Sequence, residues 1–338
     1  MKINHERLKA IIKGFKNKKI IVLGDYYLDE YVETESTEFS PEAPVPRAII
    51  KEIRHIPGAA GNVAVGFAAL GADVHAIGVV GKDESGRILC SEMEKRRINT
   101  QGIVADSSRI TGTFTRIMLK GGSNVKQHVI RLDKENFYKT SGETKKEVKK
   151  SFENKLENSS AVFVADYDET HGTGVVDGEL LNHVAEMCKN AGVLSVGISR
   201  ANIENFKNFG ILVCNKKEAE GALGAPVKIE NPEEASINLL EKNKAKRTIV
   251  TLGKDGLSGA ENNNSIKLQS FARQVVDVCG AGDSLSAVLT LSCLSGANFE
   301  EACEIAGVGA AIAVSKNGTA SVTAEEIEKF YDFQPGVL

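Results

Sequence analysis

Short apolar runs alternate with amphipathic stretches along most of this 338-residue chain. The runs have the length and composition of buried strands and cover residues 20–25, 73–83, 161–166, 193–198, 210–215 and 247–253. The stretches between them place apolar residues at helical spacing and cover residues 58–71, 84–98, 144–157, 177–190 and 232–243. This alternation predicts an α/β fold with a doubly wound, mainly parallel sheet, in which ligands bind at the carboxyl ends of the strands.

Both ends of the chain are predicted to be helical. Near the start, one face of a helix is formed by Leu8, Ile11, Ile12 and Phe15. Toward the other end we expect helices from Asp283, over 299–315 and from Thr323. The apolar run 275–278, which directly precedes the Asp283 segment, is expected to be a strand.

Two β-rich pieces interrupt the α/β rhythm. Residues 33–55 contain a Pro-rich stretch followed by an edge-strand pattern, and residues 109–133 alternate like a hairpin that turns at 121–124. We expect these pieces to pair into one small sheet that acts as a lid over the ligand crevice. The remaining residues would form the α/β core, which comprises 1–32, 56–108 and 134–338.

Composition and charge narrow the class of protein. Apolar residues make up 42% and charged residues 26%, and the net charge of −3 argues against a nucleic-acid or anionic-membrane partner. None of the six cysteines lies in a C-x-x-C pair, which indicates reduced thiols instead of a disulfide framework or zinc site. The start is charged, and no apolar run reaches the roughly 18 residues of a membrane helix, so we expect a cytoplasmic protein.

The segment 276–286, VDVCGAGDSLS, places glycines and an acid at the start of a predicted helix. Gly280 and Gly282 would let the backbone approach a ligand, and the helix would direct its free N–H groups at an anion. Asp283 would then be placed to accept a proton from a hydroxyl nucleophile. The alternative is a glycine-rich turn with Asp283 as a helix cap. The segment is not a Walker A loop.

Further polar residues follow predicted strands. Asp25 and Asp29 would both point into the crevice if the chain continued helically, where they suit vicinal hydroxyls; the alternative is strand-end solvation. Asn62, in the first turn of a small-residue helix, could bind a polyol. Asn215 and Glu218 could hold a phosphate oxygen and a magnesium-bound water, or simply form a capping box. The turn at 250–256 could bound a nucleotide pocket.

In order along the chain, these motifs resemble those of the ribokinase-like, pfkB-type sugar kinases. The matching pieces span almost the whole sequence and are Gly24-Asp25 with Asp29, the segment 58–71 with Asn62, 81–89, 215–218, 250–256 and 280–283. The resemblance implies a ribokinase-like α/β core with a small β lid. It also implies a carbohydrate kinase that uses ATP and Mg²⁺.

One branch of that family is more similar still. The segments 24–46, 57–64, 129–135 and 315–323 resemble the kinase part of the heptose 7-phosphate kinases, which supply ADP-heptose for lipopolysaccharide. The stretch SPEAPVP at 40–46 is the most telling, because it is not general to sugar kinases. In this branch the kinase is often fused to an adenylyltransferase with an H-x-G-H motif. The histidines here do not form that motif, so only the kinase step is implied.

The resemblance assigns catalytic and nucleotide-binding roles. Asp283 would be the catalytic base, with Gly280, Ala281 and Gly282 as the anion hole. The residues assigned to ATP, here called the nucleotide set, are Asn215, Lys216, Lys217, Glu218, Thr251, Gly253, Gly256 and Asn317. Within this set, Glu218 would reach Mg²⁺ through water.

The resemblance also assigns sugar contacts. Asp25, Asp29, Gly58 and Asn62 would contact sugar hydroxyls. A sugar that already carries a phosphate needs a cationic partner, and the candidates in the lid segments are Arg47, Lys51, Arg116, Lys126 and Arg131. Arg131 is the first choice because it lies in the matching RLD stretch.

The sequence departs from the family pattern on the nucleotide side. Gly197, Ile198 and Ser199 stand where Asp-Pro followed by Lys or Asn is usual. Cys279 replaces a usual Thr, and the stretch 165–174 diverges after Tyr167 from a usual Lys-Gly. These changes leave two alternative hypotheses about function. The protein could be a kinase for another sugar or a nucleoside, or a catalytically weak regulatory protein that binds a sugar phosphate. A homodimer through the lid edges is also expected.

Overall fold

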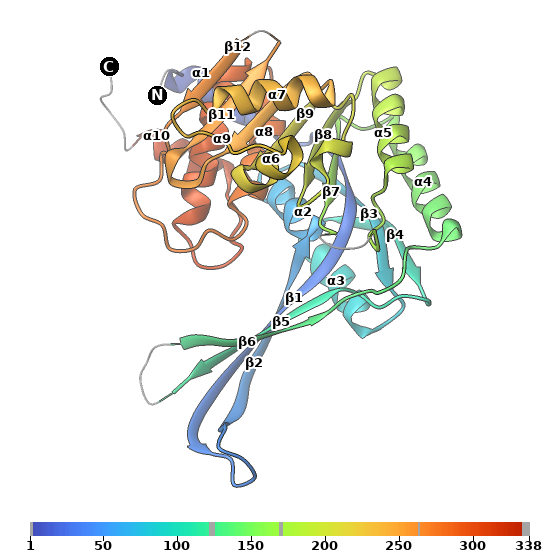
Figure 1. The fold of residues 1–338 in the computed structure, drawn as a ribbon, viewed down its shortest axis with the longest axis vertical. Helices are drawn as coiled ribbons and strands as arrows, with labels where there is room; N and C mark the ends of the chain where they lie inside the picture. Colours follow the sequence, from blue (N-terminus) through green and yellow to red (C-terminus); the bar gives the residue numbers. More distant parts are fainter. Residues whose placement is uncertain (1–2, 122–125, 169–171, 263, 333–338) are drawn as a thin grey trace.

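The computed structural model describes residues 3–121, 126–168, 172–262 and 264–332. Figure 1 shows a body of strands and helices from which a narrow β-sheet extends to one side. The tip of the 110–133 hairpin, where the turn at 121–124 is predicted, lies largely outside the described residues. In the described part of the chain, no helix has both the length and the apolar character needed to cross a membrane.

The body is built on one main sheet with the strand order β12-β11-β10-β9-β8-β7-β1-β3-β4. Its strands are β1 Lys19–Phe39, β3 Asp73–Gly81, β4 Asn99–Asp106, β7 Ala161–Asp166, β8 Leu194–Ser199, β9 Ile211–Asn215, β10 Arg247–Thr251, β11 Leu257–Glu261 and β12 Asn264–Leu268. Only the pairings of β11 with its neighbours β10 and β12 are antiparallel along this order. The expected doubly wound, mainly parallel sheet is therefore confirmed. Strand β4 is an addition that the sequence reading did not identify.

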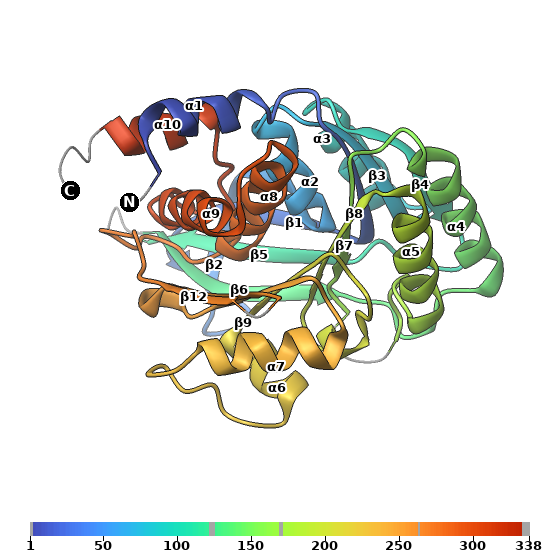
Figure 2. The same ribbon diagram turned by 90° about the horizontal axis from the view of Figure 1, so that it is seen from above.

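Helices cover both faces of this sheet. They are α1 His5–Lys13, α2 Ala60–Ala69, α3 Glu84–Glu94, α4 Gly142–Leu156, α5 Gly178–Ala191, α6 Lys216–Leu223, α7 Glu233–Asn243, α8 Ala281–Leu294, α9 Phe299–Val314 and α10 Ala324–Asp332. Figure 2 shows α8 and α9 on one side of the strands and α6 and α7 on the other. The alternation of side chains along β1 explains the two layers, because Ile20 and Val22 join one apolar core while Ile21 and Leu23 join the other.

Strand β1 is much longer than expected. We predicted a strand that ends at Asp25, and considered a helical continuation, but the strand runs on to Phe39. The reason is an exchange of partners, since β1 pairs with β3 and β7 up to Asp25 and with β2 (Pro46–Ala59) from Tyr26 onward. Asp25 and Asp29 still share one face, because every second residue of a strand points the same way.

The extended half of β1 belongs to a second, four-stranded sheet. Strand β5 (Thr113–Lys120) pairs with β1 on the side opposite to β2, and β6 (Lys126–Lys134) pairs with β5. The strands within the β-rich segments 33–55 and 109–133 thus lie in one sheet, here called the lid sheet (Figure 1). That this sheet moves as a separate lid remains a prediction.

The apolar run 275–278 is not a strand, contrary to our expectation. Residues 269–280 have no regular secondary structure, although the Val276 N–H donates to the Val314 carbonyl at 2.7 Å. Val275 and Val278 line a cavity and remain more than half exposed. Their apolar side chains therefore form the wall of a cavity, which accounts for a strand-like composition without strand pairing.

Candidate active site

The amino end of α8 carries the GAGD segment. Gly280 precedes the helix with a φ of 75°, a left-handed conformation that favours glycine. A Cβ atom on Gly280 would lie 3.0 Å from the amide nitrogen of Asn62, whereas one on Gly282 would meet nothing within 4 Å. Gly282 therefore faces open space, and first-turn N–H groups, which lack acceptors within a helix, can address a ligand there.

Asp283 lies in the first turn of α8 and is held by two side chains from other elements. The Asn62 amide on α2 donates to its Oδ2 at 2.5 Å, and the Tyr167 hydroxyl, just after β7, donates to its Oδ1. Burial raises the pKa of Asp283, while the hydrogen bonds from Tyr167 and Asn62 oppose that rise. A buried carboxylate with a raised pKa is a stronger base than an exposed one, which suits proton abstraction.

Asp29 and Asp25 have different environments. Asp29 is buried and accepts a hydrogen bond from Arg116 Nη1 on β5 at 2.7 Å. A Cβ atom on Gly58 would approach Asp29 Oδ2 to 2.9 Å, so glycine at 58 leaves room for this carboxylate. Asp29 and Gly58, two of the predicted sugar contacts, are therefore neighbours. Their role toward a sugar remains a proposal.

Asp25 instead anchors the chain that follows β7. Its carboxylate accepts hydrogen bonds from the backbone N–H of Val175 at 2.8 Å and of Tyr167 at 3.2 Å. Burial and the nearby charge of Asp166 raise the pKa of Asp25 to about 7. Because both carboxylate oxygens are engaged by backbone, Asp25 positions Tyr167, and through it Asp283.

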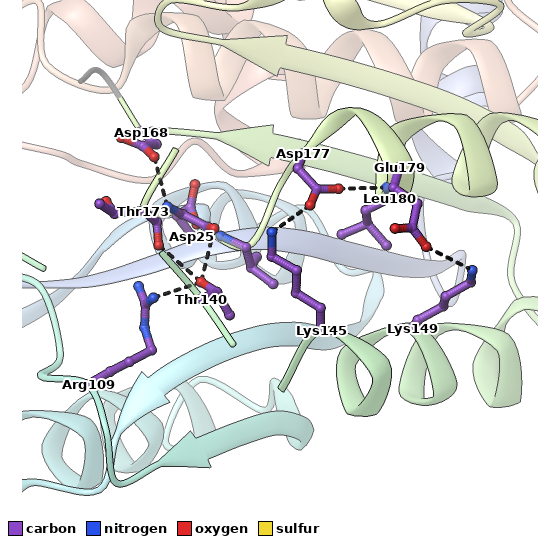
Figure 3. A network of polar contacts seen from close by, with 12 residues as sticks. Asp25, Arg109, Thr140, Lys145, Lys149, Asp168, Thr173, Asp177, Glu179 and Leu180 are labelled. Carbon is purple, nitrogen blue, oxygen red and sulfur yellow. Dashed lines mark hydrogen bonds and ion pairs between the residues drawn. The ribbon is translucent and has the colours of Figure 1, made fainter. Parts of the chain in front are cut away.

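A wider polar network secures the same region (Figure 3). Arg109 donates to the Thr140 hydroxyl at 2.7 Å, and that hydroxyl donates to the carbonyl groups of Thr173 and Gly174, each at 3.0 Å. Farther along, Lys145 donates to Asp177 at 2.5 Å. These contacts tie the segment after β7 to α4, so its described residues have a defined place beside Asp25.

One cavity of about 780 Å³ opens in front of α8. Its lining includes Gly280 to Asp283 and all of the nucleotide set except Asn317. Asn317 is exposed, and the structure does not bring it to this cavity. The sugar-side residues Asp29 and Asn62 lie outside the lining, and the hydrogen bond from Asn62 to Asp283 connects the two sides. A nucleotide-sized cavity thus meets the sugar side at Asp283.

Asn215 and Glu218 form the capping box that was the alternative interpretation of their spacing. Asn215 Oδ1 accepts from the Glu218 N–H at 2.9 Å, and Glu218 Oε2 accepts from the Asn215 N–H at 2.7 Å. Both residues also line the cavity. No cluster of three metal-ligating side chains occurs among the described residues. Both oxygens of Glu218 accept hydrogen bonds from Asn215, so a Mg²⁺ ion held mainly by phosphates would meet Glu218 through water, which remains a proposal.

The turn after β10 forms another wall of the cavity. Thr251, Gly253 and Gly256 all line it. Gly256 has a φ of 91°, and a Cβ atom there would lie 2.0 Å from the Leu268 carbonyl oxygen. Glycine at 256 is therefore required for β11 and the segment after β12 to pass this closely.

The departures at 197–199 have a structural explanation. A Cβ atom on Gly197 would lie 2.3 Å from Cδ1 of the buried Phe206 ring, so Phe206 fills the space that an aspartate would need. Ser199 donates to Asp166 Oδ2 at 2.7 Å and accepts from the Asn202 N–H at 2.7 Å. No charge from residues 197–199 reaches the cavity.

Three residues make contacts at the candidate site that were not predicted from the sequence. Arg116 was only one of several lid cations, yet it pairs with Asp29, while the first choice, Arg131, pairs with Asp133 at 2.7 Å and stacks on Phe114. Tyr167 was noted only as retained and is found on Asp283. Arg200 was not considered, and it lines the cavity. Long-range pairing created all of these contacts, so local patterns could not reveal them.

The fold has relatives among solved structures. Phosphofructokinase-2 from Escherichia coli in complex with potassium matches with a TM-score of 0.72 and 19% identity, covering 94% of this chain and 99% of that one. Arabidopsis thaliana ribokinase complexed with ribose and ATP matches with a TM-score of 0.68 and 18% identity, covering 94% and 100%. The expected ribokinase-like fold is confirmed.

Sequence comparison defines the family. The model of the pfkB family carbohydrate kinases matches residues 17–326, and the chain belongs to this family. Among curated proteins, the bifunctional protein HldE of Desulfatibacillum aliphaticivorans is 34% identical over 95% of this chain, and that of Helicobacter pylori (strain HPAG1) is 32% identical over 92%. The aligned regions cover 64% and 65% of those proteins, so the chain spans slightly less than two thirds of their length.

Proposed function

We propose that the protein transfers the γ-phosphoryl group of ATP to a hydroxyl of a phosphorylated sugar, with the anomeric hydroxyl of D-glycero-D-manno-heptose 7-phosphate as acceptor. Mg²⁺ bound with ATP would neutralise phosphate charge. The product would be the 1,7-bisphosphate, a precursor of ADP-heptose. We place the reaction in the cytoplasm, because the six cysteines are free thiols.

The observation that carries the proposal is the environment of Asp283. This partly buried base lies where a nucleotide-sized cavity meets Asn62 and the sugar-side residues. Asp283 takes the proton of the acceptor hydroxyl while its oxygen bonds to the γ-phosphorus, and the bond to the β–γ bridging oxygen breaks to leave ADP. Positioning and the amides at 280–283 would supply most of the rate enhancement.

A row of cationic side chains on the lid sheet supports a phosphorylated sugar. Cross-strand pairing places Arg54 beside Tyr31, Tyr31 beside Arg116, and Arg116 beside Arg131. We call Arg54, Arg116 and Arg131 the arginine row. It lies on the same face as Asp29, two residues before Tyr31. Guanidinium groups side by side repel one another unless anions intervene, and each has more donors than its one carboxylate partner uses. A phosphate dianion suits this row.

The reaction is tested by measuring ADP release with Mg·ATP against a panel of sugars and sugar phosphates that includes heptose 7-phosphate. We expect turnover with the heptose phosphate and little with unphosphorylated sugars. Turnover with another sugar phosphate would replace the heptose assignment. Binding of ATP or sugar phosphate without any turnover would favour a regulatory protein over a kinase. The absence at 197–199 of the charged residues usual in the family pattern supports that alternative.

The arginine row leads to a specific prediction for substrate discrimination. Arg54→Gln should raise KM for the sugar phosphate by about 10-fold, the value of one exposed charge-assisted hydrogen bond, with a small change in kcat. Arg54 suits this test because it is half exposed and because its buried partner Glu33 keeps an ion pair with Lys126 at 2.8 Å. Arg87→Gln, an exposed arginine of α3, is the matched control. Equal KM values for Arg54→Gln and wild type would remove the row from the phosphate site.

We also propose a homodimer through the opposite face of the lid sheet. One cross-strand row on that face is entirely apolar, with Ile53 beside Val32, Val32 beside Ile117 and Ile117 beside Ile130. Ile53 and Ile130 are 47% and 51% exposed, which is costly unless a second copy covers them. Ile130→Lys should therefore shift the mass measured by light scattering to that of a monomer. His128→Lys, on the arginine-row face, should not; a wild-type monomer would contradict the proposal.

A further inference from the structure

Arg200 follows β8 directly and enters the cavity in front of α8. Its backbone N–H donates to the Asp166 carbonyl at 3.1 Å, which ties the chain after β8 to the end of β7. Tyr167, the next residue after Asp166, hydrogen-bonds to Asp283. The ends of β7 and β8 and the start of α8 therefore converge around Arg200, Tyr167 and Asp283.

Arg200 is the first residue after the β8 interior that can bring a positive charge into this space. Gly197 has no side chain and abuts Phe206, and Ile198 is apolar. The Ser199 hydroxyl is occupied by Asp166 and by backbone N–H groups. A cation needed at this end of the cavity would consequently have to come from position 200 or from another element.

The Arg200 guanidinium is held by an aromatic ring. Its Cζ lies 5.2 Å from the centroid of the Tyr167 ring, and no carboxylate within ion-pair distance of it occurs in the described part of the chain. Stacking orients a guanidinium while leaving its in-plane N–H donors free for an anion. The side chain is exposed, so these donors are accessible to a ligand in the cavity.

Other cations of the cavity wall differ from Arg200 in position. Lys216 lies 3.7 Å from Glu220 on α6, and Lys254 belongs to the turn after β10. Arg200 acts on the reacting end, since its charge lowers the pKa of Asp283 against the larger effect of burial. Among Arg200, Lys216 and Lys254, Arg200 is therefore the cation whose charge acts on Asp283, the proposed site of phosphoryl transfer.

We propose that Arg200 binds the non-bridging oxygens of the phosphoryl group in transit, holding it between Asp283 and the amides at the start of α8. This inference rests on the proposed kinase function. Arg200 forms no covalent bond; its planar donors neutralise charge that spreads over the equatorial oxygens as the terminal phosphorus passes from ADP to the acceptor. Tyr167 serves as a shared support, because its ring carries Arg200 and its hydroxyl holds Asp283.

Arg200→Gln tests the proposal by separating the terminal phosphate from the rest of the nucleotide. We expect kcat to fall by about 100- to 1,000-fold, as for the loss of one transition-state donor. Binding of a non-hydrolysable ATP analogue, measured by calorimetry, should weaken while binding of ADP stays within about 2-fold of wild type. Arg200→Lys should recover part of kcat, because it restores charge without the planar donors. Arg273→Gln, an exposed arginine outside the cavity lining, is the matched control.

The outcomes separate this proposal from the kinase assignment. Unchanged kcat with unchanged binding of the ATP analogue, or equal weakening of the analogue and ADP, would overturn the role of Arg200 at the terminal phosphate. If the wild type turns over no sugar, the kinase proposal fails, and the comparison of analogue with ADP still decides where Arg200 binds. A lowered melting temperature for Arg200→Gln with normal ADP affinity would indicate a structural role and would also count against the proposal.

Discussion

Asp283→Asn is expected to lower kcat by about 100- to 10,000-fold, the range for loss of a positioned general base. Asparagine has nearly the same shape but accepts no proton. The hydroxyl of Tyr167 can still donate to the amide oxygen, and the Asn62 amide can turn its oxygen toward the new NH2 group, so the variant should remain folded and keep its nucleotide cavity. ADP release under saturating substrate measures kcat, and ADP binding measures whether the cavity is intact.

The stability of this variant gives an independent check. Burial raises the pKa of Asp283 in the folded protein, so folding favours the neutral form and the ionised form destabilises the fold. This destabilisation grows as the pH rises from the ordinary pKa of the group toward its folded value, and then stays constant. Asparagine is neutral at every pH, so its melting temperature near neutrality should equal or exceed that of the wild type.

Two results would contradict the assignment of Asp283. An unchanged kcat would rule it out as the base, and a large loss of ADP affinity would show that the substitution had damaged the cavity instead. Glu84→Gln is the matched control, because it also converts a carboxylate in the first turn of a helix to an amide, at an exposed position. It should change neither kcat nor stability noticeably.

Gly197→Asp is expected to reduce the free energy of unfolding by about 3 kcal/mol or more. The substitution restores the acid that is usual in the family pattern, but its Cβ would lie 2.3 Å from the Phe206 ring. Forcing extra atoms into a packed core costs about 1–3 kcal/mol, and burying a charge without a partner adds to that. Chemical denaturation and the melting temperature both measure the effect.

The double variant Gly197→Asp with Phe206→Ala tests the cause. If the clash with Phe206 is responsible, the double variant should be more stable than the sum of the two single effects predicts. Gly221→Asp is the control, because a Cβ atom at Gly221 meets nothing within 4 Å and the position is exposed. A stable and more active Gly197→Asp would show that the core tolerates the acid, contrary to this reading.

Local pattern was sufficient for much of the fold. The order of strands and helices could be predicted from apolar periodicity. Each buried strand is covered by helices on both faces, so its sequence is a continuous apolar run. The GAGD segment at the start of α8 could also be predicted from the sequence, since the positive φ at Gly280 favours glycine. The wrong strand at 275–278 shows the limit of this reasoning, because an apolar run can line a cavity as well as a sheet.

Single residues of the candidate site were less predictable. Asp25 and Asp29 have the same local appearance, yet Asp25 accepts hydrogen bonds from backbone N–H groups after β7 while Asp29 pairs with Arg116. Both partners come from segments distant in sequence. The preference for Arg131 over Arg116 depended on a matching motif, and a motif contains no information about which strand lies beside β1.

The amino-acid sequence alone therefore determined the class of fold, the family resemblance and the position of the proposed catalytic aspartate, because these depend on periodicity and on backbone conformations that particular residues require. Tertiary structure alone decided which polar and charged side chains contact one another. It brought Tyr167 and Asn62 to Asp283, placed Arg200 on Tyr167 and aligned the arginine row across the lid sheet. Such contacts depend on the register and pairing of distant strands, and electrostatic interactions act only over the short distances that this pairing creates.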